Sequence, residues 1–207
     1  MLNPSFIGID PGGNRLGVAV YTFDPVTLEL TVAHVETLYV DRHAYLNDHL
    51  NEPFGERFTR IKVIEQHMSR LLDLYRPMWV AIETPYYGRL PAAFSALLEC
   101  VGAVRQALIE HDVNVPLYNL SPMAVKSGVG SIGNDKDDVA AAILKLGLVD
   151  CVKDLDEHST DALAVGYTMF SQLYLGATNE PIRRRQTSRR KKSKKGTKRR
   201  RANKRRK

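Results

Sequence analysis

The stretch FIGIDPGGNRLGVAV, residues 6–20, most constrains what this chain can fold into, because it joins two apolar runs through a tight turn. The first run ends on a carboxylate, Asp10, and Pro-Gly-Gly-Asn follows at once. Runs rich in Val, Ile and Leu are typical of strands, and Pro, Gly and Asn favour turns. The pattern predicts two neighbouring strands with an acid at the carboxyl end of the first. Such an acid is either a turn residue or the first member of an active site.

The next segments continue this strand pattern and then change to a helical one. A third apolar run, Leu30–Val40, predicts a strand that completes a meander. The stretch Tyr45–Gly55 is polar, and we expect a loop there. Residues 55–75 place apolar side chains at helical spacing, and Pro77 ends that helix.

Strands and helices alternate through the rest of the body. MWVAIE (78–83) and NVPLYNL (114–120) have the composition of short buried strands. Helices are expected over 90–110, 137–146 and 157–175. Three strands followed by this alternation predict an α/β fold, a mixed sheet flanked by helices, since the opening connections are too short for parallel crossovers.

Charge divides the chain into an acidic body and a basic tail. The last 25 residues hold 17 of the 30 Lys and Arg residues and no acid, so the body carries 13 bases against 23 acids, a net charge of −10. We expect a nuclease-sized domain over 1–178 and a disordered basic tail over 179–207. The tail favours a polyanion partner, with a nuclear localisation signal as the alternative. Its expected DNA-binding residues are Arg183, Arg184, Arg185, Arg189, Arg190, Lys191 and Lys192.

Other composition signals are plain. No run of about 18 apolar residues is present, so no membrane span is expected. Cys100 and Cys151 form no metal-ligand spacing and are interpreted as reduced thiols of a cytoplasmic protein, or of a nuclear one in a eukaryotic or viral setting. No small-molecule cofactor is expected.

Four side chains have the context of a single site. Asp10 and Glu83 each end a predicted strand, and the carboxyl ends of strands form the ligand-binding edge of open α/β sheets. His158 and Asp161 lie three residues apart at the start of a predicted helix, so they share a face. Taken singly, each has an ordinary interpretation as a turn residue, a local cap or a surface side chain.

Taken together, the acids predict a metal site. Three carboxylates brought close together repel one another, and burial adds to the rise in their pKa values. A divalent cation relieves that repulsion, and oxygen ligands suit Mg²⁺ or Mn²⁺. Two such ions support hydrolysis of a phosphodiester bond.

The motifs resemble, in order, those of the RuvC-type Holliday junction resolvases of the ribonuclease H-like superfamily. The matching stretches are GIDPGGNRLGVAV, RPMWVAIETPYY, FSALLECVGAVRQAL, VPLYNLSPMAVKSGVGSIGNDKDDV and DEHSTDALAVGYT, within residues 5–175. The third of these is similar to a long helix and the fourth to a basic loop region. The resemblance implies a ribonuclease H-like mixed five-stranded sheet and a structure-selective endonuclease that cuts four-way DNA junctions by paired symmetric nicks.

The resemblance also implies roles for individual residues. It makes Asp10, Glu83, His158 and Asp161 the ligands of two Mg²⁺ ions, with Mn²⁺ as a substitute. It places Lys126 and Lys136 at the scissile phosphate and Tyr86, or else Tyr87, against an unpaired base of the junction. It implies a homodimer, for which we expect the helix Leu90–Glu110 to form the interface.

The chain also departs from the family pattern. The loop between Lys126 and Lys136 is one residue shorter, and the segment 45–55 and the tail have no counterpart in the usual bacterial enzyme, which would suit a bacteriophage or viral member. Alternative functions are a flap, branched-DNA or RNA–DNA hybrid nuclease of the same fold and a non-catalytic DNA-binding protein. A phosphotransferase of the sugar-kinase and actin type shares the strand–Asp–Gly opening, but requires two duplicated domains.

Overall fold

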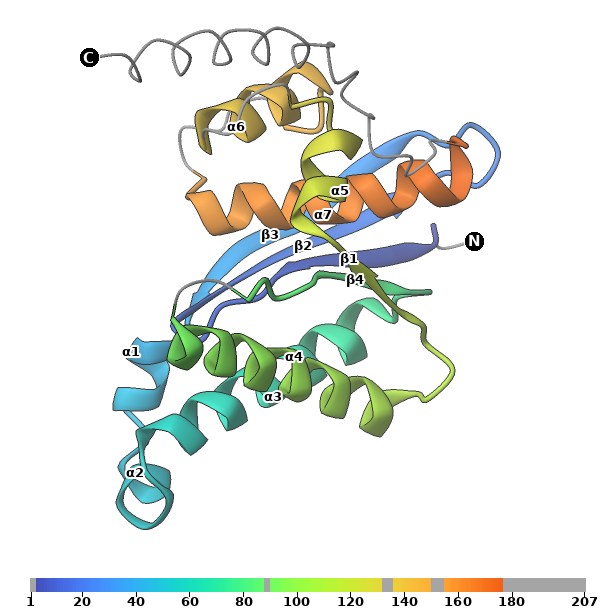
Figure 1. The fold of residues 1–207 in the computed structure, drawn as a ribbon. Coiled ribbons are helices and arrows are strands. Elements are labelled where there is room, and N and C mark those ends of the chain that lie inside the picture. Colours follow the sequence, from blue (N-terminus) through green and yellow to red (C-terminus); the bar gives the residue numbers. More distant parts are fainter. Residues whose placement is uncertain (1–2, 88–89, 132–135, 150–154, 177–207) are drawn as a thin grey trace, which may run out of the picture.

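The fold is built on one mixed sheet of five strands, with helices on both of its faces (Figure 1). The computed structural model describes residues 3–87, 90–131, 136–149 and 155–176. The strand order across the sheet is β3-β2-β1-β4-β5. The strands are β1 (Ser5–Asp10), β2 (Arg15–Phe23), β3 (Leu30–Tyr39), β4 (Val80–Glu83) and β5 (Leu117–Leu120). This architecture confirms the expected mixed α/β fold.

The register of the sheet brings two predicted site residues to one edge. β1, β2 and β3 form an antiparallel meander, whereas β4 and β5 run parallel to β1. Ile9 on β1 lies opposite Ile82 on β4. The next residue on each strand is Asp10 and Glu83, so both carboxylates stand at the carboxyl edge of the sheet, where adjacent strands end.

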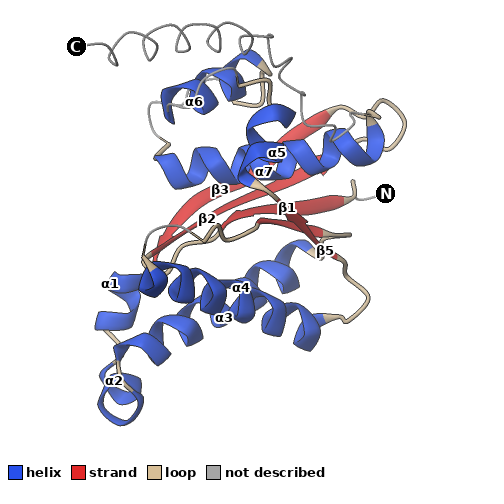
Figure 2. Ribbon diagram, in the orientation of Figure 1, coloured by secondary structure: helices blue, strands red, loops and turns tan. Residues whose placement is uncertain are grey.

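Two groups of helices cover the sheet (Figure 2). α3 (Glu56–Tyr75) and α4 (Pro91–His111) pack together on one face, and α7 (Glu157–Tyr174) lies across the other, joined by α5 (Pro122–Gly128) and α6 (Lys136–Lys145). The apolar residues accordingly form two buried clusters, one on each side of the sheet. The first includes Ile9, Val18, Ile64, Met68, Ile82 and Val104, and the second includes Phe6, Tyr21, Trp79, Leu163 and Phe170.

An aromatic stack fills the second cluster near the amino ends of β1 and β4. The ring of Phe6 lies parallel to those of Trp79, Tyr21 and Phe170, with centroids 4.1, 4.9 and 5.5 Å away. Phe23 meets Phe170 edge-on at 5.3 Å. Offset and edge-to-face pairs of this kind stabilise a core by about 0.5–1.5 kcal/mol each beyond their burial.

Two predictions about local structure are wrong. The stretch Tyr45–Gly55 is not a loop: α1 (Val40–Tyr45) and α2 (Asp48–Phe54) occupy most of it. α2 buries none of its residues, so it has no apolar periodicity to read, and an Asn51 side chain that donates to the carbonyl of Ala44 helps to hold it. α5 falls in the expected basic loop region; it has only seven residues, too few for a periodic pattern, although Ser121 caps its start.

α7 lies unusually close to the sheet because glycines stand where the two meet. A Cβ on Gly8 would lie 2.4 Å from the carbonyl oxygen of Ala162 and 2.5 Å from the nitrogen of Gly166. A Cβ on Gly17 would lie 2.0 Å from the carbonyl oxygen of His158. These are backbone atoms, which cannot swing aside as a side chain can. The glycines of β1, β2 and α7 thus set the distance between the helix and the sheet.

This packing predicts a large cost for Gly8→Ala. The added methyl group has to displace the backbone of α7, so we expect a loss of at least about 3 kcal/mol of unfolding free energy, measured by chemical denaturation. The comparison variant is Ile9→Val, on the same strand in the other core, which removes one methylene group and costs about 1 kcal/mol. A Gly8→Ala protein as stable as Ile9→Val would contradict the backbone contact described here.

Candidate active site

Asp10 and His158 form the direct contact at the centre of the site. Asp10 ends β1, and His158 stands in the first turn of α7; their Oδ2 and Nδ1 atoms are 2.7 Å apart. Burial raises the pKa of Asp10, and the hydrogen bond to His158 opposes that rise. The same hydrogen bond raises the pKa of His158. A strand end and a helix start are thereby linked across 148 residues of sequence.

Glu83 and Asp161 complete an electrostatically coupled cluster. Burial raises the pKa of Glu83 to about 7, and repulsion from Asp10 and Asp161 contributes to the rise. Burial likewise raises the pKa of Asp161 to about 6, with repulsion from Asp10 next in importance. Perturbed carboxyl groups gathered at the ligand-binding edge of a sheet are typical of functional sites.

An anchored cap fixes the start of α7, and this arrangement was missed in the sequence. The Asp156 carboxylate accepts a hydrogen bond from the backbone N–H of Ser159, which makes Asp156 the N-cap. Its Oδ1 atom also accepts a hydrogen bond from the hydroxyl of Thr37 on β3. Thr37 lies 2.8 Å from the Ser159 hydroxyl as well. The turn that carries His158 is therefore attached to the sheet, and the signal that predicts it is Asp three residues before Ser at a helix start.

The structure brings one of the two predicted lysines to this cluster. Lys126 on α5 lies close enough to Glu83 and Asp161 to lower the pKa of each carboxyl group. Lys136 is the first residue of α6, and its side chain lies outside the described part of the chain. The predicted tail residues from Arg183 onward are also outside it, as is the domain boundary at 178.

The two predicted tyrosines differ in their surroundings. Tyr86 and Tyr87 follow β4 just after Glu83, and their side chains are 76% and 63% exposed. The ring of Tyr87 packs edge-on against Phe94 of α4, with centroids 5.2 Å apart. Tyr86 has no ring contact of this kind among the described residues, so its ring is the more available for stacking.

The cluster does not form a ready coordination sphere. Within the described ranges, no three or more His, Cys, Asp or Glu side chains converge closely enough to hold a metal ion. Asp10 and His158 instead contact each other through atoms that would serve as ligands. The four residues are coupled by charge and share one edge of the sheet, and cation binding would require their side chains to turn toward a common point.

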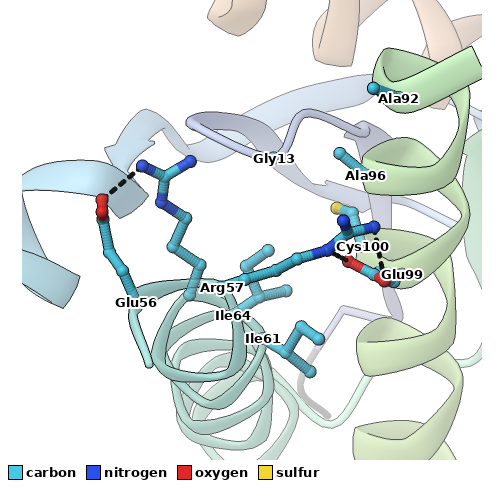
Figure 3. Close-up of a pocket in the computed structure, with 10 residues that line it drawn as sticks. Gly13, Glu56, Arg57, Ile61, Ile64, Ala92, Ala96, Glu99 and Cys100 are labelled. Atoms are coloured by element: carbon cyan, nitrogen blue, oxygen red, sulfur yellow. Dashed lines mark hydrogen bonds and ion pairs between the residues drawn. The ribbon is translucent and has the colours of Figure 1, made fainter. Parts of the chain in front are cut away.

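A separate pocket of about 250 Å³ lies between the first halves of α3 and α4, beside the turn after β1 (Figure 3). It is lined by Gly13, Ile61, Ala96 and Cys100, together with two ion-paired couples. Arg57 donates twice to Glu99, and Arg60 pairs with Glu56. Because these charges already neutralise each other, the pocket is distinct from the acidic cluster.

The raised pKa values predict a specific pH dependence of stability. Glu83 binds its proton more tightly in the folded chain than in the unfolded one, so its contribution to stability falls as the pH rises from about 4.5 to 7. A shift of this size corresponds to a change on the order of 3 kcal/mol. With a chelator present, Glu83→Gln should therefore gain at least about 5 °C in Tm over the wild type between pH 5 and pH 8.

The control for this thermal denaturation series is Glu52→Gln, an exposed position on α2. Millimolar MgCl₂ should raise the wild-type Tm more at pH 8 than at pH 5, because protons and the cation compete for the same carboxylates. The interpretation is wrong if Glu83→Gln and Glu52→Gln have the same Tm-against-pH profile.

Comparison with known proteins agrees with this geometry. Residues 6–169 match the family described as crossover junction endodeoxyribonuclease RuvC. A Treponema denticola protein of that name is 31% identical over 170 residues, which cover 81% of this chain and 85% of the relative. The structure of T. thermophilus RuvC in complex with Holliday junction substrate matches with a TM-score of 0.63 at 25% identity, covering 82% of this chain and 95% of that one.

A viral protein shares the fold at lower similarity. Fowlpox virus resolvase, solved in complex with substrate Holliday junction DNA, matches with a TM-score of 0.52 at 12% identity and covers 82% of this chain and 99% of that chain. The family match extends from β1, with Asp10, to the first turns of α7, where His158 and Asp161 stand. By its sequence, its fold and the placement of these residues, the chain belongs to the RuvC family of crossover junction endodeoxyribonucleases.

Proposed function

We propose that this protein is a divalent-metal-dependent endonuclease that resolves four-way DNA junctions by paired symmetric nicks. The observation that carries the proposal is the coupled cluster of Asp10, Glu83, His158 and Asp161 at the carboxyl edge of the sheet, in a chain of the RuvC family. The relatives named for crossover junction cleavage, and the structures solved with Holliday junction DNA, support the substrate class.

The chemistry of the cluster fits Mg²⁺, with Mn²⁺ as a substitute. Three carboxylates with raised pKa values are hard oxygen donors whose mutual repulsion a cation relieves. Asp10 would be shared between two ions, and Glu83 and Asp161 would each help to hold one. When bound, a pair of ions supplies an activated water at neutral pH and stabilises the charge on the leaving oxygen of the phosphodiester.

The protein side chains supply orientation and charge. His158, hydrogen-bonded to Asp10 in this structure, is placed to act as a further ligand or to hold a proton near the attacking water. Lys126 is close enough to Glu83 and Asp161 to offset negative charge developing on the phosphate. We assign Lys136 to the same task by resemblance. Cleavage would leave a 3′-hydroxyl and a 5′-phosphate, ends that a ligase can rejoin.

We assign base stacking at the junction to Tyr86 rather than Tyr87. The exposed ring of Tyr86 stands three residues after Glu83, so it projects beside the site that cuts. Tyr87 is engaged with Phe94. Stacking of an unpaired base on an exposed aromatic ring stabilises a complex by about 1–3 kcal/mol.

The outer face of α4 supports a homodimer. The inner face of this helix buries Cys100, Val104 and Leu108 in the core. The outer face still exposes apolar side chains, with Leu98 at 49% and Ile109 at 60% exposure. Among the described residues, α4 alone is long and apolar enough to pass a length-and-composition test for a membrane-spanning helix. A helix apolar on both faces needs a second cover, and a two-fold partner that packs α4 against α4 provides it.

A glycine on the outer face of α4 adds to this argument. A Cβ at Gly102 would meet no atom within 4 Å, so nothing inside the chain requires glycine there. Glycine in a helix interior costs about 1 kcal/mol relative to alanine. A second helix packed closely at this point accounts for that cost. The two active sites of the dimer would then face the two symmetric strands of a four-way junction.

Cleavage of a labelled DNA panel tests the proposed function. With Mg²⁺, the wild type should nick a four-way junction symmetrically in preference to a three-way junction, a flap, an RNA–DNA hybrid and linear duplex. Asp10→Asn should lower the cleavage rate at least about 1,000-fold, equivalent to about 4 kcal/mol, because a shared ligand is lost, and should keep junction binding.

Asp48→Asn, an exposed acid on α2, is the matched control and should cleave at the wild-type rate. Wild-type cleavage by Asp10→Asn would refute the assigned site. Preferred cutting of flaps or hybrids would instead favour the alternative nuclease of the same fold.

A charge placed on the outer face of α4 tests the dimer. Leu98→Glu should raise the dimer dissociation constant about 30-fold or more, because an unpaired carboxylate would be buried at the centre of the contact. Analytical ultracentrifugation measures the mass directly. Val26→Glu is the control, since Val26 is an equally apolar and 88% exposed side chain in the turn between β2 and β3. A Leu98→Glu protein with the wild-type dissociation constant would exclude this face as the interface.

A further inference from the structure

Two arginines flank one tyrosine ring at the carboxyl edge of the sheet. Arg15 is the first residue of β2, Tyr39 is the last of β3, and the two lie directly opposite each other in the antiparallel ladder. Arg42 follows on α1. The guanidinium carbon of Arg42 lies 4.3 Å from the centroid of the Tyr39 ring, and that of Arg15 lies 5.4 Å away. Cation–π contact at these distances holds both guanidinium groups in place.

This arginine–tyrosine cluster lies on the face of the sheet where α7 begins (Figure 1). Thr37, two residues before Tyr39, contacts Asp156 and Ser159 of the α7 cap. Since side chains alternate along a strand, Tyr39 shares that face, and its hydroxyl lies 3.4 Å from Oδ2 of Asp156. The cluster therefore stands beside the turn that carries His158.

The charge of the two arginines is not balanced within the described chain. Ion pairs in the described ranges neutralise Arg57 and Arg60, but none joins Arg15 or Arg42 to a carboxylate. Both side chains are exposed to solvent. Two guanidinium groups that share one ring repel each other, and an anion placed between them relieves that repulsion.

We propose that Arg15, Tyr39 and Arg42 form a binding site for a backbone phosphate of the DNA next to the cut. This proposal rests on the proposed function, which brings DNA to the same edge of the sheet. The guanidinium fork matches the oxygens of a phosphodiester, and stacking on Tyr39 orients it before the DNA arrives. The site compensates for the acids around Asp10 and Asp156, which would otherwise repel the strand.

Salt dependence of binding tests the proposal in the full chain. A labelled four-way junction is titrated in chelator, where no cutting occurs, at several KCl concentrations. Each phosphate contact contributes about 0.9 to the slope of log K against log salt, so Arg15→Ala/Arg42→Ala should lower the slope by about 1.8. The wild type should then lose about tenfold more affinity than this variant between 50 and 200 mM KCl.

A double variant of equal charge is the control. Arg70→Ala/Arg76→Asn removes two exposed positive charges from the far end of α3 and its cap, and Asn suits the left-handed backbone of residue 76. The proposal is overturned if both double variants have the same slope. Tyr39→Phe should bind like the wild type and Tyr39→Leu should bind several-fold more weakly; equal affinity of the two would exclude a role for the ring.

This test is independent of cleavage. If the wild type cuts no branched DNA in Mg²⁺, the proposed function fails, but the slopes measured in chelator still decide whether Arg15 and Arg42 contact phosphate. If cleavage occurs and the slopes of the two double variants agree, only the phosphate site fails.

Discussion

The contact of α7 with β1 and β2, backbone against backbone, is the constraint on which the site depends. Gly8 and Gly17 leave no side chain between the helix and the sheet, so the first turn of α7 rests directly on the strands. The anchored Asp156 cap then fixes that turn along the sheet edge. The result is that His158 reaches Asp10 at hydrogen-bond distance. A helix held one methyl group further away would separate the two halves of the cluster.

Electrostatic strain is the cost of this arrangement. Burial and mutual repulsion keep the pKa values of Glu83 and Asp161 well above those of free carboxyl groups. The structure offsets part of the strain with Lys126 and with the imidazole of His158. A bound cation would offset the rest. Acids in such an environment are more useful for holding metal ions near a phosphate than for stabilising the fold.

Much of the fold could be predicted because its elements have strong local patterns. The meander, the helix over 55–75 and the parallel strand before Glu83 were all legible from apolar spacing and turn residues. The convergence of Asp10 with Glu83 followed from strand direction alone. By contrast, α2 lies on the surface without a buried face, so no periodicity marks it. The roles of Gly8 and Thr37 depend on what approaches them from a distant part of the chain, which no local pattern encodes.

The aromatic stack has a practical consequence for spectroscopy. Trp79 is the one tryptophan of the chain, and it lies buried against Phe6 at the amino end of β4, the end opposite Glu83. Its indole ring is shielded from solvent and from anything docked at the other edge. Intrinsic fluorescence will thus report on the integrity of the hydrophobic interior while remaining blind to ligand occupancy, and an extrinsic dye is needed to follow the latter.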